Sequence, residues 1–484
     1  MILRLVFIVF SAWFLNVSLV YAQIEGLDEP IDNNNELNFE TDESTPKSTF
    51  TQPWESSVLI RDERAGEIAA LSFGGRALSG ANGMEIFIFD LGQADSALIV
   101  GPSPERRSLL IDLGKSKSPG KGGKWSYEHV GQRIYDILGK FEVDYALITH
   151  FHSDHLGYGD YGFLGLMDKS APAFKVGTLI DTGDMGEEYL STKNLKKRKA
   201  FSKRVSKWIR KGQLDQREQP LFGASQIDLG GSVIVEMATF AGRTHPEHGG
   251  VHEDYAANHA GHYDGKGANE NDLSIGVKVI VGDFEFWTAG DLSGASGRGT
   301  SPLSGSGDGY TNVEWPLVQY LEENNIEADV EVYRANHHGS RYSTSKPLLK
   351  ALDPEFVIYS AGEASYNHPS ASVVKNVQYT ARQFATSMDE DAWPDPSDFA
   401  KYKGEIGDEI HIMVSKDGGY YKIEDRVHRS YNDRQEAEDA DKGEEDRPLS
   451  IGESPILSGL SITPNMSSAD AQNAYRLLTE PALE

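Results

Sequence analysis

The sequence of 484 residues contains no cysteine. A disulfide framework, thiolate zinc sites, iron–sulfur clusters and a cysteine nucleophile are therefore excluded. Basic residues are also scarce, because 46 lysines and arginines stand against 74 aspartates and glutamates, giving a formal net charge of −28. Such a charge repels polyanions except at a local basic patch, so we expect no stable nucleic-acid partner. Hydrophobic residues make up 39% of the chain, enough for a sizeable core.

Long apolar runs are absent beyond the N-terminus, so no later segment is expected to span a membrane. Residues 1–22 begin with a short positive segment that includes Arg4, continue with an apolar run and end in Val20-Tyr21-Ala22. Small residues at the cleavage positions indicate a signal peptide, removed before Gln23. An uncleaved anchor helix is the alternative. We therefore expect an exported protein, periplasmic or secreted, with no transmembrane anchor after processing.

Both ends of the mature chain are acidic and poor in apolar residues. Residues 23–57 hold a single lysine among their acidic side chains, and residues 428–484 are similar. Because such segments cannot bury enough apolar surface to offset their conformational entropy, we expect a disordered acidic linker and a mostly disordered tail. Between them, residues 58–427 alternate strand and helix patterns, which predicts one α/β domain. The predicted strands span 84–89, 96–100, 108–111, 144–148, 274–281, 284–288, 329–333, 355–359, 409–414 and 419–423, and the predicted helices span 129–141 and 315–323.

The most specific signal comes directly after the apolar strand 144–148. Within six residues the chain presents His150, His152, Asp154 and His155. Imidazole and carboxylate groups are ligands for Zn²⁺ or Mn²⁺. A solvated polar loop is the alternative, but four ligand-type residues in six positions argue against it. The pattern therefore predicts a metal site, with the last two of these residues able to face a second ion.

Further ligand-type residues follow other predicted strands. Asp291 follows strand 284–288, the pair His337 and His338 follows strand 329–333, and His368 comes after strand 355–359. A single strand-end residue of this kind is more often a cap or a turn residue. Their recurrence at the same end of successive strands indicates one site.

His-x-His-x-Asp-His is similar to the signature of the metallo-β-lactamase fold, an αβ/βα four-layer sandwich. The chain resembles the soluble domain of competence-protein ComEC-type proteins, and also the phosphorylcholine-esterase type of enzyme, over about residues 84–425.

Two positions depart from the sequence pattern of these proteins. Ala94 replaces a glycine, so its loop must avoid positive φ. Tyr158 stands where a second glycine is usual and is expected to narrow the entrance. The other matching segments are Phe89–Asp95, Leu110–Gly114, Asn271–Ser274, Gly290-Asp291, His337–Ser340 and Asn367–Pro369.

The resemblance implies a dinuclear centre of two divalent ions, with Zn²⁺ favoured and Mn²⁺ possible. One ion is expected to bind His150, His152 and one residue of the histidine pair, His337 being our choice. The other is expected to bind Asp154, His155 and His368, with Asp291 bridging the two. If His368 is not a ligand, a histidine from 245–262 replaces it.

The same resemblance implies roles in catalysis. A hydroxide shared by both ions would attack the substrate, with Asp154 at the catalytic centre. His338, the member of the pair left without a metal, would protonate the leaving oxygen. Supporting positions behind the ligands are expected for Asp90, Asp95, Asp112 and Asn271.

Three segments lie outside these motifs. Residues 193–211, in an insertion at about 190–212, hold ten basic residues and no acidic one, with apolar residues at near-helical spacing. This predicts a basic amphipathic helix that either neutralises an acidic surface or docks anionic substrates through Lys196, Lys197, Lys203 and Lys207. Residues 243–271 are a histidine-rich loop, and 293–309 are a Gly/Ser-rich segment expected to be a mobile flap.

We therefore expect an exported metal-dependent hydrolase of phosphodiester bonds, in nucleic acid or in a phospho-substituted envelope polymer. The substrate would be a small molecule or a polymer that carries a phosphodiester or an ester. A lactone, β-lactam or ester hydrolase of the same fold is one alternative. A binding protein without turnover is the other, although its ligand set should then have degenerated.

Overall fold

The described residues of the computed structural model all belong to one compact unit of the chain, 62–484. The expected signal peptide, the acidic linker, histidines 245–262 and most of the flap 293–309 and of the tail 428–484 lie outside these residues, so those expectations stay predictions. The first residues of the expected tail are described, and strand β20 (Arg426–Arg429) extends into it. The described ranges are 72–73, 76–77, 83–115, 126–244, 270–294, 313–315, 317–318, 328–362, 368–388, 396–423 and 426–430.

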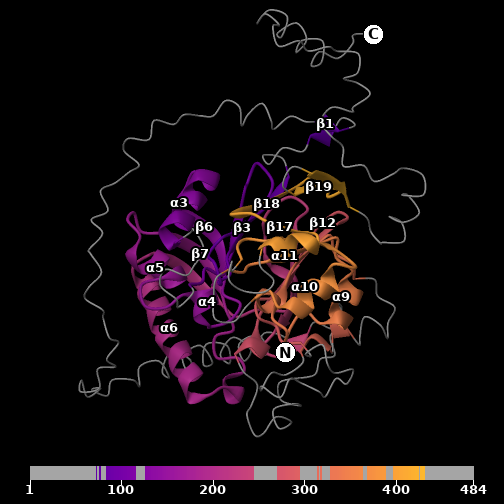
Figure 1. The fold of residues 1–484 in the computed structure, drawn as a ribbon. Helices are drawn as coiled ribbons and strands as arrows, with labels where there is room; N and C mark the ends of the chain where they lie inside the picture. The colour runs from indigo at the N-terminus through magenta and orange to yellow at the C-terminus, as the bar shows by residue number, and fades with distance from the viewer. Residues whose placement is uncertain are drawn as a thin grey trace, which may run out of the picture. The chain divides into compact units, whose positions relative to one another are not determined.

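Two large mixed sheets form the centre of the unit (Figure 1). The first sheet has the spatial order β20-β19-β18-β3-β4-β5-β6-β7-β8. Its strands are β3 (Met84–Phe89), β4 (Ala97–Val100), β5 (Ser108–Ile111), β6 (Glu142–Leu147), β7 (Lys175–Ile180), β8 (Leu214–Glu218), β18 (Glu409–Val414), β19 (Tyr420–Ile423) and β20 (Arg426–Arg429).

The second sheet has the order β11-β10-β12-β13-β14-β15-β16-β17, with β9 also paired to β10. Its strands are β9 (Gly223–Ile227), β10 (Ile234–Phe240), β11 (Arg243–Thr244), β12 (Gly276–Val281), β13 (Phe284–Thr288), β14 (Val332–Arg334), β15 (Phe356–Tyr359), β16 (Arg382–Ala385) and β17 (Gly404–Ile406). A separate two-stranded pair consists of β1 (Ser72–Phe73) and β2 (Arg76–Ala77).

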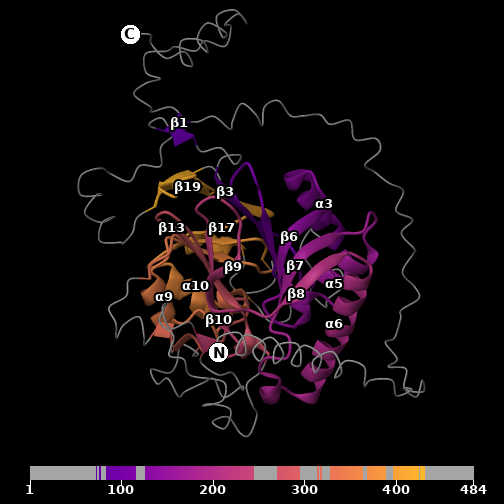
Figure 2. The same cartoon turned by 180° about the vertical axis from the view of Figure 1, so that it is seen from behind.

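Helices lie on both flanks of the sheets in opposite views (Figures 1 and 2). One flank holds α3 (Tyr127–Leu138), α4 (Ser153–Leu156), α5 (Gly162–Lys169) and α6 (Thr192–Arg210). The other holds α9 (Lys346–Leu352), α10 (Ala371–Val377) and α11 (Pro396–Lys401). Three short 3₁₀ helices complete the described elements: η2 (Glu187–Tyr189), η4 (Asn271–Leu273) and η5 (Asn336–Gly339).

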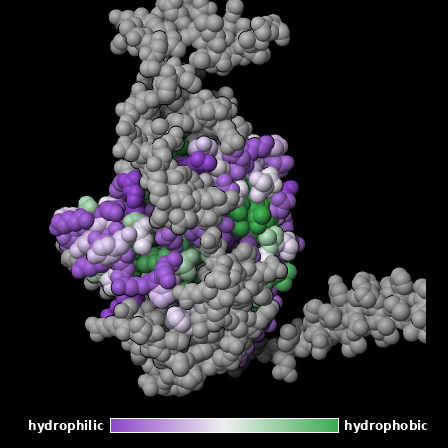
Figure 3. All heavy atoms as spheres, turned by 90° about the vertical axis from the view of Figure 1, so that its right-hand side faces the viewer, coloured by the Kyte–Doolittle hydropathy of each residue, from purple (hydrophilic) through white to green (hydrophobic). Residues whose placement is uncertain are grey.

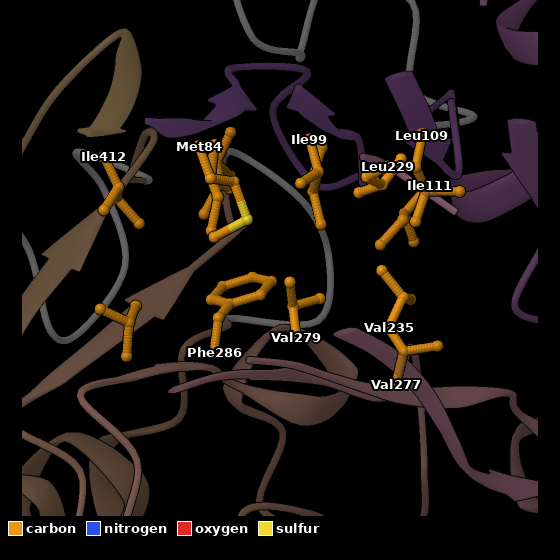
Figure 4. Close-up of a cluster of buried hydrophobic side chains, with 14 of the residues drawn as sticks. Met84, Ile99, Leu109, Ile111, Leu229, Val235, Val277, Val279, Phe286 and Ile412 are labelled. Atoms are coloured by element: carbon orange, nitrogen blue, oxygen red, sulfur yellow. The ribbon is translucent and has the colours of Figure 1, made fainter. Parts of the chain in front are cut away.

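The main core lies between the two sheets, where both present alternate apolar side chains. In Figure 4, Met84, Ile99 and Ile111 of the first sheet face Val279 and Phe286 of the second. Two further apolar clusters lie between each sheet and its own helices. This helix–sheet–sheet–helix layering is the αβ/βα four-layer sandwich of the metallo-β-lactamase fold, so the fold prediction is confirmed. Figure 3 shows mainly hydrophilic side chains, with smaller apolar areas between them, over the described surface of one face.

The layers bring the carboxyl ends of the parallel strands to a common edge. Strands β5 to β8 run parallel in the first sheet, and β13 to β17 run parallel in the second. Because loops that follow such strands leave the sheet at the same edge, the segments after β6, β13, β14 and β15 can converge. These are the segments that carry the candidate ligands.

Most predicted elements match the observed ones to within a few residues. The helix predicted at 129–141 ends earlier, at Leu138, because Gly139 takes a left-handed conformation with φ of 70°. Ala94 is not among the described residues with positive φ, as its loop requires, and Gly92 has φ of 65° in its place. The helix predicted at 315–323 lies mostly outside the described residues.

Candidate metal centre

Local backbone features bring two loops close together at the centre. His150 and His152 follow β6, and Asp154 and His155 lie in the short helix α4. Asp291 follows β13 after Gly290, whose φ is 51°. A Cβ atom at Gly290 would lie 2.5 Å from Oγ1 of Thr149, so only glycine allows this approach.

One compact group of ligand-type atoms comprises Asp154, His155, Asp291 and His338. Nε2 of His155 lies 2.9 Å from Oδ1 of Asp291. Nε2 of His338 lies 3.6 Å from the same oxygen and 3.7 Å from Oδ2 of Asp154. The sequence had suggested His368 for this set and a proton-donor role for His338. The geometry instead groups His338 with the ligands, because its Nε2 faces both carboxylates.

A second compact group comprises His150, His152 and Asp291. Nε2 of His150 lies 3.6 Å from Oδ2 of Asp291, and the His150 and His152 rings are 4.8 Å apart. Nε2 of His337 lies 3.5 Å from the same Oδ2. The two oxygens of Asp291 thus face one group each, which is the placement of a bridging carboxylate.

Several buried atoms in this centre suit a cation. Within the described part of the chain, Nε2 of His150, His155 and His338 and Oδ1 of Asp291 are buried without a hydrogen-bond partner. Leaving such groups unsatisfied is costly, and a lone pair facing a carboxylate oxygen is repulsive unless a proton or a cation lies between them. Neutral imidazole nitrogen and carboxylate oxygen are ligands of zinc and manganese. The residues present therefore fit two divalent ions that share Asp291.

Charge inside the centre controls which histidines hold protons. Burial lowers the pKa of His155, but the Asp291 carboxylate and its neighbours outweigh burial and raise that pKa well above its ordinary value. Burial is likewise outweighed at His338, where Asp95 and Asp291 raise the pKa to about 10. At His150, burial lowers the pKa well below its ordinary value. Two histidines of the metal-free centre thus hold protons that a cation would displace, since ligating imidazole is neutral.

Burial would also raise the pKa of Asp291, but the charges of His155, His337 and His338 hold it well below its usual range. Asp154 behaves in the same way, because its interaction with His338 and the charge of His155 outweigh burial and lower its pKa. Both carboxylates are therefore ionised and available to a cation.

Asp112 orients His155. Its Oδ2 lies 2.8 Å from Nδ1 of His155 and accepts a hydrogen bond of 2.7 Å from the Thr149 hydroxyl. Its Oδ1 accepts a hydrogen bond of 2.8 Å from the backbone N–H of Thr149. With Nδ1 bonded to Asp112, Nε2 of His155 points at the ligand group, the arrangement expected of a carboxylate behind a ligating histidine.

His338 is oriented by groups from both sheets. Its Nδ1 lies 2.8 Å from the carbonyl oxygen of Ser360 and 3.3 Å from Oδ1 of Asp95. A carbonyl can only accept, so Nδ1 carries the proton and Nε2 is left for a ligand role. Asp95 also pairs with the buried Arg334, whose Nε donates to the Ser360 hydroxyl at 3.2 Å. Arg334 lies in an apolar strand pattern, and a basic residue there is the signal that could have identified it.

The remaining expected residues differ in their distance from the ligand atoms. Oδ1 of Asp90 accepts a hydrogen bond of 2.9 Å from the backbone N–H of Gly92, which makes Asp90 a turn residue of the neighbouring loop. Nδ2 of Asn271 lies 3.5 Å from Nε2 of His337. The ring of His368 lies 5.5 Å from that of His337, beside the centre.

A buried carboxylate that the sequence did not reveal holds the histidine-pair loop. Glu314 is fully buried, and its Oε1 accepts hydrogen bonds from Nδ2 of Asn336 at 2.9 Å and from the backbone N–H of Thr344 at 2.7 Å. Its Oε2 accepts from the backbone N–H of Ser345 at 2.9 Å. Glu314 therefore links both ends of the segment that carries the pair.

The basic segment forms the predicted helix, as α6. Lys196, Lys203 and Lys207 are exposed, and Lys197 is half-buried. Nζ of Lys207 lies 3.1 Å from Oδ1 of Asp168. Burial lowers the pKa of His152 although Asp154 and Asp291 oppose it, and the positive charge of Lys197 on α6 adds to that lowering.

One basic residue of α6 is buried rather than exposed. Arg198 donates to Oε1 of Glu270 from Nε at 3.2 Å and from Nη2 at 2.7 Å. The same oxygen accepts a longer hydrogen bond of 3.4 Å from the backbone N–H of Phe151, between two candidate ligands. Arg198 shares the spacing of Phe201, Val205 and Trp208 on the buried face of α6, a signal present in the sequence.

The sequence matches no protein-family model and no curated protein. Among solved structures it is similar to a mutant of CmlA β-hydroxylase, with 14% identity, a TM-score of 0.29 and coverage of 61% of this chain and 52% of that chain. It is also similar to a diphosphatase of the PhnP family, with 10% identity, a TM-score of 0.31 and coverage of 62% and 94%. A third is unliganded yeast PDE1, with 10% identity, a TM-score of 0.35 and coverage of 69% and 100%. Identities and TM-scores this low give no information on function, which depends on the side chains of this chain.

Taken together, the sandwich and the His/Asp cluster define a chain of the metallo-β-lactamase fold with a candidate dinuclear metal centre. Among the described residues, no helix combines the length and the apolar character needed to cross a membrane.

Proposed function

We propose that this protein is an exported, dinuclear metal-dependent hydrolase of phosphodiester bonds. The observation that carries the proposal is the convergence on the two oxygens of Asp291, where Nε2 atoms of four histidines lie within 3.6 Å. When bound, two divalent ions would supply Lewis acidity and a nucleophile derived from water at neutral pH. Zn²⁺ is favoured over Mn²⁺ because histidines dominate the ligand set.

The chain's own residues prepare the centre for this chemistry. Asp112 and the Ser360 carbonyl fix His155 and His338 so that the Nε2 atoms face Asp291. Because these contacts are formed before substrate arrives, little reorganisation is needed during the reaction. Asp154 has 29% of its side chain exposed whereas Asp291 has 2%, so substrate would approach from the Asp154 side.

The basic end of α6 favours a phosphodiester over a neutral ester. Lys197 lies close enough to His152 to affect its pKa, and Lys196 and Lys203 are exposed on the same helix. Cations beside a metal centre attract an anionic phosphodiester and give a neutral lactone or ester no comparable benefit.

A turnover screen of purified, zinc-loaded protein tests the proposal. We expect hydrolysis of bis-nitrophenyl phosphate, loss of that activity in a chelator and its return with added zinc. Asp291→Ala should abolish turnover and lower the content of both ions, because its carboxylate contacts both ligand groups. Hydrolysis of nitrocefin or lactones without phosphodiester turnover would overturn the substrate class, and a fully loaded protein inactive on every substrate would overturn the enzymatic role.

A further inference from the structure

Two exposed tyrosines lie next to the candidate metal centre. Tyr158 follows α4 by two residues and is 44% exposed, and Tyr161 is 45% exposed. Their ring centroids are 5.8 Å apart with an interplanar angle of 36°. Large apolar side chains that are exposed as a pair, rather than singly, indicate a binding surface.

The backbone beneath the two rings is held in place. The N–H of Tyr161 donates to the carbonyl of Tyr158 at 3.0 Å, and the N–H of Phe163 donates to the carbonyl of Leu113 at 2.7 Å. Gly162 has φ of 65°, and a Cβ atom there would lie 2.5 Å from the Leu113 carbonyl oxygen. A fixed turn presents the rings with little ordering cost when a ligand binds.

This turn is attached to the backbone of the ligand residues. Tyr158 is four residues after Asp154, so their Cα atoms are separated by at most about 14 Å. The backbone N–H of Lys115 donates to the carbonyl of Ser153 at 2.8 Å, which ties Lys115 to the same loop. The turn that carries the rings and the backbone of Lys115 are therefore both joined to the loop that carries Asp154, the more exposed carboxylate ligand.

The charge beside the rings selects the ligand. Nζ of Lys115 lies 5.9 Å from the centroid of the Tyr161 ring, so a cation already occupies the neighbourhood of that ring. A quaternary ammonium headgroup such as choline would be repelled there. A flat aromatic ring joined to an anion suits both features, and a nucleotide combines a base with a phosphate.

We propose that Tyr158, Tyr161 and Lys115 form a stacking subsite for a nucleobase of a nucleotidyl phosphodiester that is cleaved at the metal centre. This inference rests on the proposed phosphodiesterase function and narrows its substrate class to nucleotide-containing diesters. Tyr158 then contributes to substrate specificity.

The test compares substrates that share the nitrophenolate leaving group: thymidine 5′-nitrophenyl phosphate, methyl nitrophenyl phosphate and nitrophenyl phosphorylcholine. Tyr158→Ala and Tyr161→Ala should each raise KM for the thymidine diester by about 5- to 150-fold, the usual value of one base stack. The methyl diester, which has no base, should show a much smaller rise in KM in both variants. Tyr135→Ala is the matched control, since Tyr135 is 47% exposed on α3 outside this turn.

Lys115→Gln should raise KM more for the thymidine diester than for the phosphorylcholine ester, because in the phosphorylcholine ester the lost attraction for the phosphate is offset by the lost repulsion of the quaternary ammonium. Equal losses on the methyl and thymidine diesters would overturn the subsite, as would unchanged KM in both tyrosine variants. Selective loss on the phosphorylcholine ester would assign the rings to a cation instead.

If the wild-type protein hydrolyses no diester, the proposed function fails but the subsite is still tested by calorimetric titration with thymidine 5′-monophosphate. Binding that disappears in the double tyrosine variant supports the subsite, and absence of binding to the wild-type protein refutes it.

Discussion

Replacing Glu314 by alanine should destabilise the protein and remove one metal ion. The substitution leaves three buried donors without an acceptor: Nδ2 of Asn336 and the backbone N–H groups of Thr344 and Ser345. Each unsatisfied buried donor costs about 1–3 kcal/mol, and water entering the space left by the side chain would return part of that. We therefore expect a loss of about 3–5 kcal/mol in the free energy of unfolding, a large part of the total for an ordinary domain.

The effect on metal follows from the position of Asn336, directly before the histidine pair. His338 needs its present backbone conformation to face Asp154 and Asp291, and loosening the loop should release that ligand first. Metal analysis should give about one zinc per chain in place of two, the remaining ion being held by the His150 and His152 group. Urea unfolding of the metal-free protein measures the change in the free energy of unfolding without the contribution of metal binding.

Glu331→Ala is the matched control, because Glu331 is also a buried glutamate and accepts a backbone hydrogen bond, from Glu285 at 2.6 Å, away from the histidine-pair loop. It should lower stability and keep both ions. Glu314→Gln should fall between wild type and Glu314→Ala, since its single oxygen can serve only part of the donors. Two retained ions in Glu314→Ala, together with a stability change below about 1 kcal/mol, would refute the reasoning.

Three further sets of substitutions test the metal ligands, the ion pair between Asp168 and α6, and the exposed lysines of α6. His338→Ala should lower the zinc content to about one per chain whereas His368→Ala should leave two, as measured by elemental analysis, and the opposite ranking would contradict the ligand assignment. Burial raises the pKa of Asp168, but hydrogen bonds from α6 outweigh it and lower that pKa. The stabilisation from Asp168 is therefore present above the unfolded value of about 3.9 and lost as pH falls. The difference in unfolding free energy between wild type and Asp168→Asn should therefore shrink as pH falls below about 5 and through the lowered pKa of Asp168, and a constant difference would argue against it. Replacing Lys196 and Lys203 by Gln should raise KM for a polyanionic substrate and flatten its salt dependence while sparing a small diester, and equal effects on both substrates would indicate a folding role for α6.

Elements with a strong local pattern could be predicted from the sequence. The hairpin of β12 and β13 and that of β18 and β19 combine alternating apolar residues with a short turn, and both are present. Helix α6 spans Thr192–Arg210, one residue from the predicted 193–211, because its apolar residues recur at helical spacing.

Elements whose pattern depends on their neighbours could not be predicted. Strand β8, Leu214–Glu218, is polar along most of its length and lies at the edge of its sheet, where pairing with β7 determines its conformation. Its sequence has no alternation that would distinguish it from a loop. The short helices α9 to α11 were missed for a related reason, since each buries only a few residues against the second sheet.

The identity of the ligand residues could be predicted more readily than their grouping. The resemblance implied that only one of His337 and His338 binds metal and that the other protonates the leaving oxygen. In the structure both residues have left-handed backbone conformations, with φ of 52° and 56°, so both Nε2 atoms reach Asp291, at 3.5 and 3.6 Å. Such a conformation is costly for histidine and persists only where surrounding contacts impose it.

Those contacts come from parts of the chain that are distant in sequence. Asp95 and the Ser360 carbonyl hold the ring of His338, and Glu314 holds the residue before the pair. None of them lies in the pattern that identifies the pair as candidate ligands, so spacing alone gives no basis for choosing His338 over His368. If these contacts determine which histidines bind each ion, loss of Asp95 should weaken binding of the same metal ion that is lost with His338. The reason is that the ring of His338 would no longer be held with its Nε2 toward Asp291.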